Sequence, residues 1–263
     1  MKNNIFSVLG LFVLTFLSSC SKNSNDELAI VNPPANTIKK IIETVYYNAT
    51  PTTSFATFIY ENGILKQLQA DSNYRLDFEY DGNKLMNSKR YQNSILQGTT
   101  NLIYNGNLLQ IVQVNAGERT QFTYQGNVLK SSEYQSNSNS GWTTLESKNY
   151  TFDANNNISE TLRFNNFNGT PSNYKYGSTY DNKNNPFSQM NPYIRLFFDF
   201  ETIDILSQNN KSKTFTFTSP TSTTSTQTEY YEIIYNSQNY PTSVKKKRFT
   251  TNVLVSEMSI EYN

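Results

Sequence analysis

Three acidic side chains gather in an apolar stretch near residue 200: Asp199, Glu201 and Asp204. Two carboxyl groups that face each other across a cleft, about 5 to 10 Å apart, can hydrolyse a glycosidic bond. The same acids are explained more simply as the solvent-facing side of a hydrophobic insertion. We favour the simpler interpretation, and a carboxylate-dependent hydrolase of envelope or extracellular polysaccharide is the alternative.

Residue types that the chain lacks exclude other catalytic chemistries. The sequence contains no histidine, and Cys20 is its single cysteine. Histidine is the commonest general base near neutral pH and the commonest metal ligand. Ser-His-Asp and Cys-His mechanisms are therefore impossible, and no intrachain disulfide can form. We predict that the protein is not an enzyme and has no cofactor and no metal site.

Two segments space their side-chain oxygens as calcium loops do: Asp153-x-Asn155-x-Asn157 and Asp181-x-Lys183-x-Asn185. Both lack the glycine and the distal glutamate of an EF-hand loop. Asp and Asn are also favoured in turns, because their side chains hydrogen-bond the local backbone. We interpret both segments as hairpin turns.

Two other features could bind a ligand. Trp142 follows the Ser/Asn-rich stretch 136–141 and could offer its ring to a sugar, although we favour a ring packed against the sheet. The basic run 245–248 could bind a polyanion, but alternate strand residues point to opposite faces, and charges also protect edge strands. We favour edge protection. With 22 basic and 21 acidic residues, the chain lacks the basic excess of a nucleic-acid-binding protein.

The N-terminal residues predict export. Lys2, the apolar run 5–17 and small residues before Cys20 have the pattern of a signal peptide, and residues 17–20, Leu-Ser-Ser-Cys, match the lipobox of bacterial lipoproteins. This match implies lipid attachment at Cys20. We predict a signal peptide over 1–19, a flexible tether over 20–37 and a single domain over 38–263. The lipid would anchor the protein to the cell envelope, at the outer membrane of a Gram-negative bacterium.

A repeated unit indicates how the domain is built. An aromatic strand end, a tight turn and a leucine recur at 60–65, 80–85, 104–109 and 124–129, with weaker copies beginning at 152, 180 and 235. Apolar and charged residues alternate around the turns, as expected for half-buried antiparallel strands. We predict an all-β fold: an antiparallel meander of repeated hairpins, strongly curled or barrel-like. We expect its apolar face inward and its charged face in water, rather than a barrel embedded in a membrane.

One segment interrupts the repeats. Residues 190–207 are apolar on more than one face and contain no glycine. Periodicity does not distinguish a short buried helix from an irregular plug, and we favour a helical insertion that covers one end or face of the sheet. We expect any localised function in this insertion or in the loop before Trp142.

The hairpin units resemble the tyrosine-aspartate (YD/RHS-like) repeats of large bacterial surface and toxin-shell proteins. Together with the lipobox, Asn-Pro-Phe at 185–187 and Leu-Ser-x-Asn-Asn at 206–210, they more closely resemble a family of uncharacterised bacterial lipoproteins with a porin-like β fold. The resemblance covers most of the chain after the tether. It implies a fold and no activity.

These observations predict a lipid-anchored envelope protein that serves as a non-catalytic binding or structural interaction module. Its expected contacts are the membrane, through the lipid on Cys20, and a glycan or another envelope protein. A scaffold subunit of a larger envelope complex is a further possibility. The sequence predicts no oligomeric state.

Overall fold

The computed structural model describes residues 35–46, 50–71, 73–138, 141–167, 169, 171–197, 203–217, 219, 221 and 223–263. The predicted signal peptide, the lipidation site Cys20 and nearly all of the predicted tether lie outside the described residues, as do Asp199 and Glu201.

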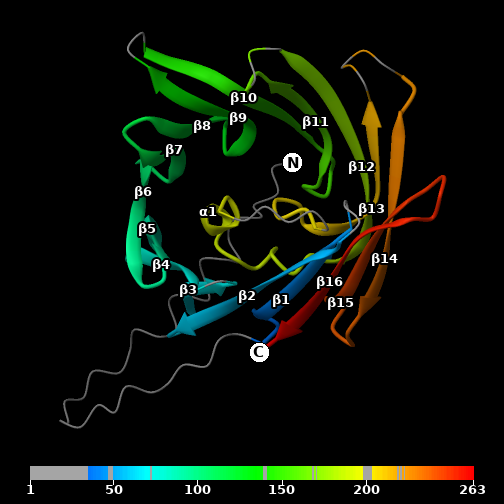
Figure 1. Cartoon of the computed structure of the whole chain (residues 1–263), viewed down its shortest axis with the longest axis horizontal. Coiled ribbons are helices and arrows are strands. Elements are labelled where there is room, and N and C mark those ends of the chain that lie inside the picture. The colour runs from blue at the N-terminus through cyan, green and yellow to red at the C-terminus, as the bar shows by residue number, and fades with distance from the viewer. Residues whose placement is uncertain are drawn as a thin grey trace, which may run out of the picture. The chain divides into compact units, whose positions relative to one another are not determined.

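Within these residues, antiparallel strands follow one another along the chain and close into a 16-stranded barrel, in which β1 pairs with β16 (Figure 1). The prediction of an all-β hairpin meander is confirmed, and closure pairs every strand on both sides, which removes free edges. The strand bounds are β1 Ile38–Val45, β2 Thr52–Glu61, β3 Ile64–Ala70, β4 Tyr74–Asp81, β5 Lys84–Gln92, β6 Ile95–Asn105, β7 Leu108–Asn115, β8 Glu118–Gln125, β9 Val128–Ser138, β10 Gly141–Phe152, β11 Ile158–Asn165, β12 Ser172–Asn184, β13 Asn209–Phe217, β14 Gln227–Tyr235, β15 Pro241–Arg248 and β16 Leu254–Tyr262.

The repeated unit is a hairpin with a β-bulge beside its turn. In the second copy Tyr80 pairs with Leu85 and Glu79 pairs with Asn87, so that Met86 is the extra residue of the bulge. The other three clear copies have the same register shift immediately before their tyrosine. The bulge places the tyrosine and the leucine on the inner face, and Leu85 is completely buried.

The tyrosine hydroxyls of the repeats link neighbouring hairpins. Tyr80 donates to the carbonyl of Leu65 in the preceding copy, and Tyr104 donates to Leu85, each over 2.6 Å. Two later tyrosines keep this arrangement: Tyr180 donates to the carbonyl of Ile158 over 2.8 Å, and Tyr262 of the last strand donates to the carbonyl of Pro241 over 2.7 Å. Tyr235 differs, because its hydroxyl donates to the Asp181 carboxylate. The repeat therefore encodes a contact between consecutive hairpins as well as each hairpin itself.

The insertion after β12 begins at Asn185, earlier than the sequence predicts, and enters the barrel (Figure 1). We call its described residues, 185–197 and 203–208, the plug. Its helical part is the single turn α1, Pro192–Arg195, and the rest is irregular, so the predicted insertion is present with little helix. In the described part of the chain no helix has the length and hydropathy needed to cross a membrane.

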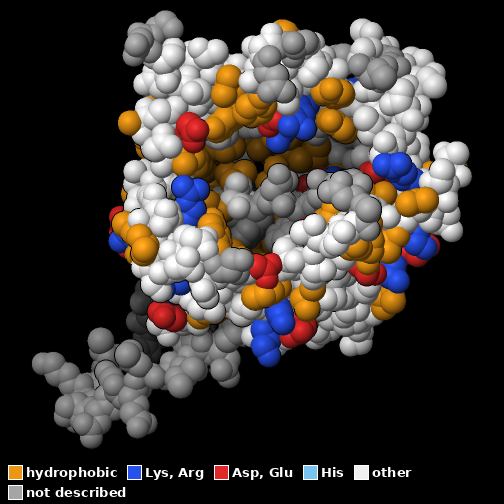
Figure 2. Space-filling model, viewed as in Figure 1, with side chains coloured by type: hydrophobic (Ala, Val, Ile, Leu, Met, Phe, Trp, Pro, Cys, Tyr) orange, Lys and Arg blue, Asp and Glu red, His pale blue; other side chains and the backbone are white. Residues whose placement is uncertain are grey.

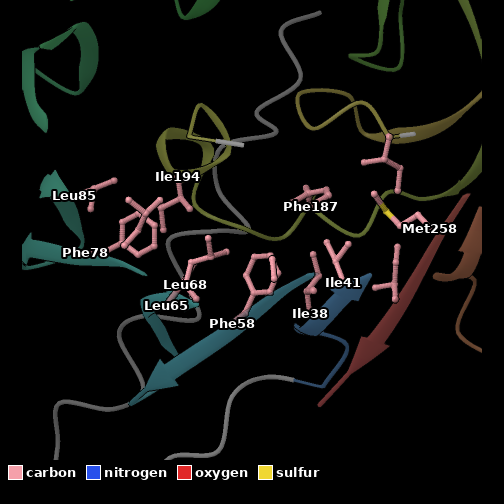
Figure 3. Close-up of a cluster of buried hydrophobic side chains, with 14 of the residues drawn as sticks. Ile38, Ile41, Phe58, Leu65, Leu68, Phe78, Leu85, Phe187, Ile194 and Met258 are labelled. Carbon is pink, nitrogen blue, oxygen red and sulfur yellow. The ribbon is translucent and has the colours of Figure 1, made fainter. Parts of the chain in front are cut away.

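The plug completes the hydrophobic core of one half of the lumen. Phe187 and Ile194 of the plug lie among inward-pointing side chains of the early strands, including Phe58 and Phe78, and of β16 (Figure 3). Phe187 is fully buried. Tyr193 stacks edge-on against Tyr104, with ring centroids 5.2 Å apart. Apolar packing therefore fills most of this half of the barrel, and smaller cavities of about 220 and 430 Å³ remain beside the plug.

The outer wall carries ion pairs together with exposed apolar side chains, among them Ile103 of β6 and Ile234 of β14. Arg75 pairs with Asp77 over 2.9 Å on β4, and Lys247 of β15 pairs with Glu232 of β14 over 2.7 Å. Arg75 and Asp77 alternate with the buried Leu76, so they point away from the lumen. The apolar-inward and charged-outward arrangement predicted from the alternation is present on these strands of the apolar half, whereas the inner wall between β10 and β15 carries charged side chains, which the prediction missed.

Candidate functional site

The other half of the lumen, enclosed by β7 to β15, contains a cavity of about 570 Å³. Leu196, Ile203 and Leu206 of the plug form its apolar floor, and its walls carry hydroxyl groups, aromatic rings and charged side chains. Figure 2 shows the hollow at the centre of the molecule. Small-molecule sites commonly have volumes of roughly 300 to 1,000 Å³, so this cavity is large enough to be one.

One wall of the cavity contains a buried ion pair. Lys246 of β15 lies 3.0 Å from Glu229 of β14, and the two side chains are 9% and 8% exposed. The other oxygen of Glu229 accepts a hydrogen bond from Gln227 over 2.8 Å. A buried charge needs such partners, because an unpaired one is costly.

A second ion pair joins the plug to the wall. Asp204 of the plug lies 3.5 Å from Lys211 of β13, accepts a hydrogen bond from the Leu206 amide over 3.0 Å and lies 3.0 Å from the Tyr180 hydroxyl. Burial alone would raise the pKa of the Asp204 carboxyl, but the positive charge of Lys211 and these hydrogen bonds lower it below its ordinary value. Asp204 is therefore an ionised anchor of the plug.

A third group on the wall has two cations and one anion. Glu146 of β10 lies 3.0 Å from Lys148 on the same strand and accepts a 2.6 Å hydrogen bond from Arg163 Nε of β11. The carboxylate side chain is 13% exposed, whereas those of Lys148 and Arg163 are 39% and 35% exposed. Both cations therefore reach further into open space than the acid between them.

Tyrosine and hydroxyl side chains complete the walls. The Tyr150 hydroxyl is 2.9 Å from Ser132 Oγ, and the Tyr231 hydroxyl is 3.1 Å from Thr214 Oγ1. These bonds cross from one strand to its neighbour and fix the rings. The polar half of the lumen is thus preformed by contacts within the protein.

Among the acids predicted as hydrolase candidates, Asp204 lies in the cavity, while Asp199 and Glu201 fall outside the described residues. A glycosidase needs one carboxyl group whose pKa is raised, so that it stays protonated and acts as the acid. The lowered pKa of Asp204 does not suit it for that role.

Trp142 is the other predicted site residue, and it does not line the cavity. It pairs with Asn137 on the outward side of β10, and the Arg119 guanidinium lies 4.1 Å from the centre of its ring. The ring is half-buried under this cation. The favoured interpretation, a ring packed back on the sheet, agrees with this position.

The first calcium-like segment is a turn, as predicted. Asp153 Oδ1 accepts hydrogen bonds from the amides of Asn155 and Asn157, over 2.8 and 2.9 Å. The second segment was wrongly interpreted as a hairpin turn: Asp181 lies within β12, where its Oδ1 accepts from the Lys183 amide over 2.9 Å. The strand continues to Asn184 because the plug replaces the tight turn at this copy.

The edge-protection interpretation of 245–248 is also wrong, because β15 lies between β14 and β16 in a closed barrel. Alternation divides the run as the sequence predicts. Lys245 and Lys247 pair with acids on the outer wall, whereas Lys246 is buried in the lumen.

Two motifs on which the resemblance rests prove to be buried plug anchors. Asn185 is completely buried, donates to the Asp204 carbonyl over 2.6 Å and accepts from the Phe187 amide over 2.9 Å. Ser207, also fully buried, accepts from the Ile158 amide over 3.0 Å. The role of these residues is to hold the plug on β11 to β13.

Sequence reasoning missed most of the charged residues of the cavity. Glu229 shares its side of β14 with Tyr231, and Glu146 shares its side of β10 with Lys148 and Tyr150. The alternation could have identified these residues, because each lies on the same side of its strand as aromatic residues that point into the lumen.

No protein-family model matches the chain, and no curated protein matches its sequence. The solved structures that are similar include a porin-like protein from Bacteroides uniformis, with 12% identity and a TM-score of 0.45, over 88% of this chain and 100% of that one. They also include a porin-like protein from Bacteroides vulgatus, with 15% identity and a TM-score of 0.46, over 86% of this chain and 98% of that one. Both carry the porin-like description that the resemblance implied. Membership of a repeat-bearing lipoprotein family stays a prediction.

Proposed function

We propose that the protein is a non-catalytic binding module of the bacterial cell envelope, and that it holds a hydroxyl-rich ligand, a glycan, in the polar half of its lumen. The observation that supports this is a cavity of about 570 Å³ whose polar groups are already fixed by the protein. Polar groups that are already fixed lose little conformational entropy when a ligand binds, so less of the binding free energy is spent on ordering them. Aromatic rings such as those of Tyr150 and Tyr231 can pack against the apolar faces of sugar rings.

The outer wall supports a domain that is tethered to the envelope and surrounded by water. A membrane-spanning barrel presents an apolar band to lipid, whereas this wall carries ion pairs on β4, β14 and β15. The lipid on Cys20 would supply the anchor. The surroundings of Asp204 lower the pKa of its carboxyl, so this residue does not suit the role of the protonated acid in a hydrolase.

A glycan array probed with the full-length chain tests this proposal. We expect the chain to retain at least one oligosaccharide. The substitution Thr161→Trp fills the cavity and should abolish retention, because Thr161 lies on its wall. The matched substitution Thr151→Trp, at an exposed residue of β10, should leave retention unchanged.

The variant Trp142→Ala separates the lumen from the outer surface. We expect it to bind as the wild-type chain does, because Trp142 lies on the outward side of β10. An array that retains nothing contradicts the proposal. If Trp142→Ala loses retention while Thr161→Trp keeps it, the binding site is not in the lumen.

A further inference from the structure

Lys148 and Arg163 lie directly opposite each other on β10 and β11, facing the cavity. Like charges in directly opposed positions of an antiparallel pair destabilise a sheet. Glu146, diagonal to Arg163, is the carboxylate shared by the two cations. This group of three, which we call the cationic triad, therefore has one positive charge in excess.

The other ion pairs on the cavity wall do not share this imbalance. Lys246 lies 3.0 Å from Glu229, and Lys211 lies 3.5 Å from Asp204, so neither of these cations faces a second cation across a shared acid. Among the described residues that line this cavity, Lys148 and Arg163 are the two cations that share one acid, and their side chains are more exposed than those of Lys211 and Lys246. A structural ion pair would be expected to be balanced and shielded.

The position of the triad in the barrel favours contact with a ligand. Arg163 is near the end of β11 that is remote from the plug, since the strand begins at Ile158 beside the plug residue Ser207 and ends at Asn165. A guanidinium has five N–H donors and an ammonium has three. Glu146 engages two nitrogens of Arg163 and the single nitrogen of Lys148, and the Arg163 guanidinium also interacts with Tyr176. These contacts use fewer donors than the two cations have.

We infer that the ligand of the lumen carries a negatively charged group, a carboxylate or a sulfate, and that Lys148 and Arg163 bind it. This inference rests on the proposed function, which it narrows to acidic saccharides. Arg presents a planar fork that matches both groups, and hydrogen bonds between charged partners are the stronger ones. The carboxylate of Glu146 holds the two cations apart in a fixed arrangement.

Calorimetric titration of the full-length chain at low ionic strength tests the inference with three probes on one sugar: methyl glucoside, glucuronate and glucose 6-sulfate. We expect at least one acidic probe to bind about tenfold more tightly than the neutral one, the gain from one charge-assisted contact. The preferred probe identifies the group as carboxylate or sulfate. Equal affinities for all three would overturn the inference and leave the proposed function standing if methyl glucoside binds.

Substitutions that remove a positive charge and substitutions that remove a negative charge should have opposite effects, which a merely structural role would not produce. Arg163→Gln and Lys148→Gln should each remove the preference for the acidic probe, whereas Glu146→Gln should increase it, because it removes the competing carboxylate. Lys247→Gln, a cation on the outer wall, is the matched control and should change nothing. If Glu146→Gln weakens acidic binding as Arg163→Gln does, or if no acidic probe binds the wild-type chain, the inference is wrong.

Discussion

At the scale of single residues, the repeat tyrosines have two functions. Their rings pack against the core, and their hydroxyls reach the backbone of the preceding hairpin, as Tyr80 does at Leu65 and Tyr104 at Leu85. Burial raises the pKa of both phenols above the ordinary value, so each hydroxyl remains a donor over the physiological range. The acceptor is a carbonyl beside a bulge, where the regular ladder is interrupted.

The substitution Tyr80→Phe isolates this hydroxyl. It keeps the ring and leaves the Leu65 carbonyl without its 2.6 Å partner. We expect the free energy of unfolding to fall by about 1 kcal/mol, the net contribution of one hydrogen bond. Urea denaturation followed by circular dichroism measures it.

The matched control is Tyr91→Phe, which removes a hydroxyl from a ring that the Arg75 guanidinium covers at 4.1 Å, outside the repeat anchors. We expect a smaller loss there. If the free energy of unfolding falls equally in the two variants, the hydrogen bond from Tyr80 to the preceding hairpin does not contribute to stability as proposed.

The sequence predicted the inward direction of these tyrosines but not their hydroxyl bonds. Alternation determines which face a side chain occupies, and this is a local property of a strand. The partner of Tyr80 is 15 residues away, and it is positioned by a bulge that no pattern of apolar residues reveals. The same limit explains why Asp204 was identified as a candidate while its partner Lys211 was missed.

At the scale of elements, the hairpin turns differ in whether glycine alone or both asparagine and glycine adopt a positive φ. In the first copy Asn62 and Gly63 both have positive φ, at 50° and 75°. In the next three copies the glycine alone has positive φ, and the asparagine after it does not. A lone glycine at the first central position is typical of type II′ turns, and two positive residues are typical of type I′. Both types suit the twist of a hairpin.

The substitution Gly106→Ala tests the conformational demand alone, because a Cβ at Gly106 would meet no atom within 4 Å. At a φ of 60°, alanine should lower the free energy of unfolding by roughly 1 kcal/mol through backbone strain. Gly106→Asn should cost about as much, since the first central position of a type II′ turn lies outside the left-handed α region that asparagine tolerates. Thermal or urea unfolding compares the two variants.

Gly98→Ala is the control for these turn variants. Gly98 lies in β6 without positive φ, and its nearest neighbour would be the flexible end of Arg90, at 3.8 Å. We expect little change in stability there. A Gly98→Ala variant that is as unstable as Gly106→Ala would show that backbone strain at the turn is not the cause.

The strands were more predictable than the plug. Tight turns and alternation are local signals, so the clear hairpins were located from the sequence alone. The plug folds by burying Phe187 and Ile194 against distant strands and by hydrogen bonds such as that from Asn185 to the Asp204 carbonyl. Its extent and its small helical content depend on tertiary contacts, which the apolar composition of 190–207 could not specify.

At the scale of the whole molecule, closure and the plug together divide the lumen. One half is filled by the apolar side of the plug, and the other retains a cavity with ionised walls. The barrel closes through the pairing of β1 with β16, over a sequence separation that no local pattern detects. A curled sheet was predictable, whereas a divided lumen was not.

Asp204 connects the two halves, and its protonation should loosen the plug. A carboxyl group with a lowered pKa in the folded state stabilises the fold above its unfolded pKa, about 3.9, and this contribution is lost as the pH falls through the folded-state value. Wild-type stability should therefore decline below about pH 4. Asp204→Asn should cost about 2 kcal/mol at pH 7, the size of a hydrogen bond to a charged group, and should flatten the decline in acid.

Urea denaturation between pH 2 and pH 7 measures both effects. The control Glu79→Gln removes an acid from the exposed pair with Lys89 on the outer wall, where solvent screens the charges, so we expect the wild-type profile. If the Asp204→Asn and wild-type curves run parallel through the acid range, the ion pair with Lys211 does not anchor the plug. If Asp204→Asn instead becomes flat below pH 4 while Glu79→Gln does not, the acid sensitivity of the barrel resides where the plug meets β12 and β13, because that is where Asp204 meets Tyr180 and Lys211.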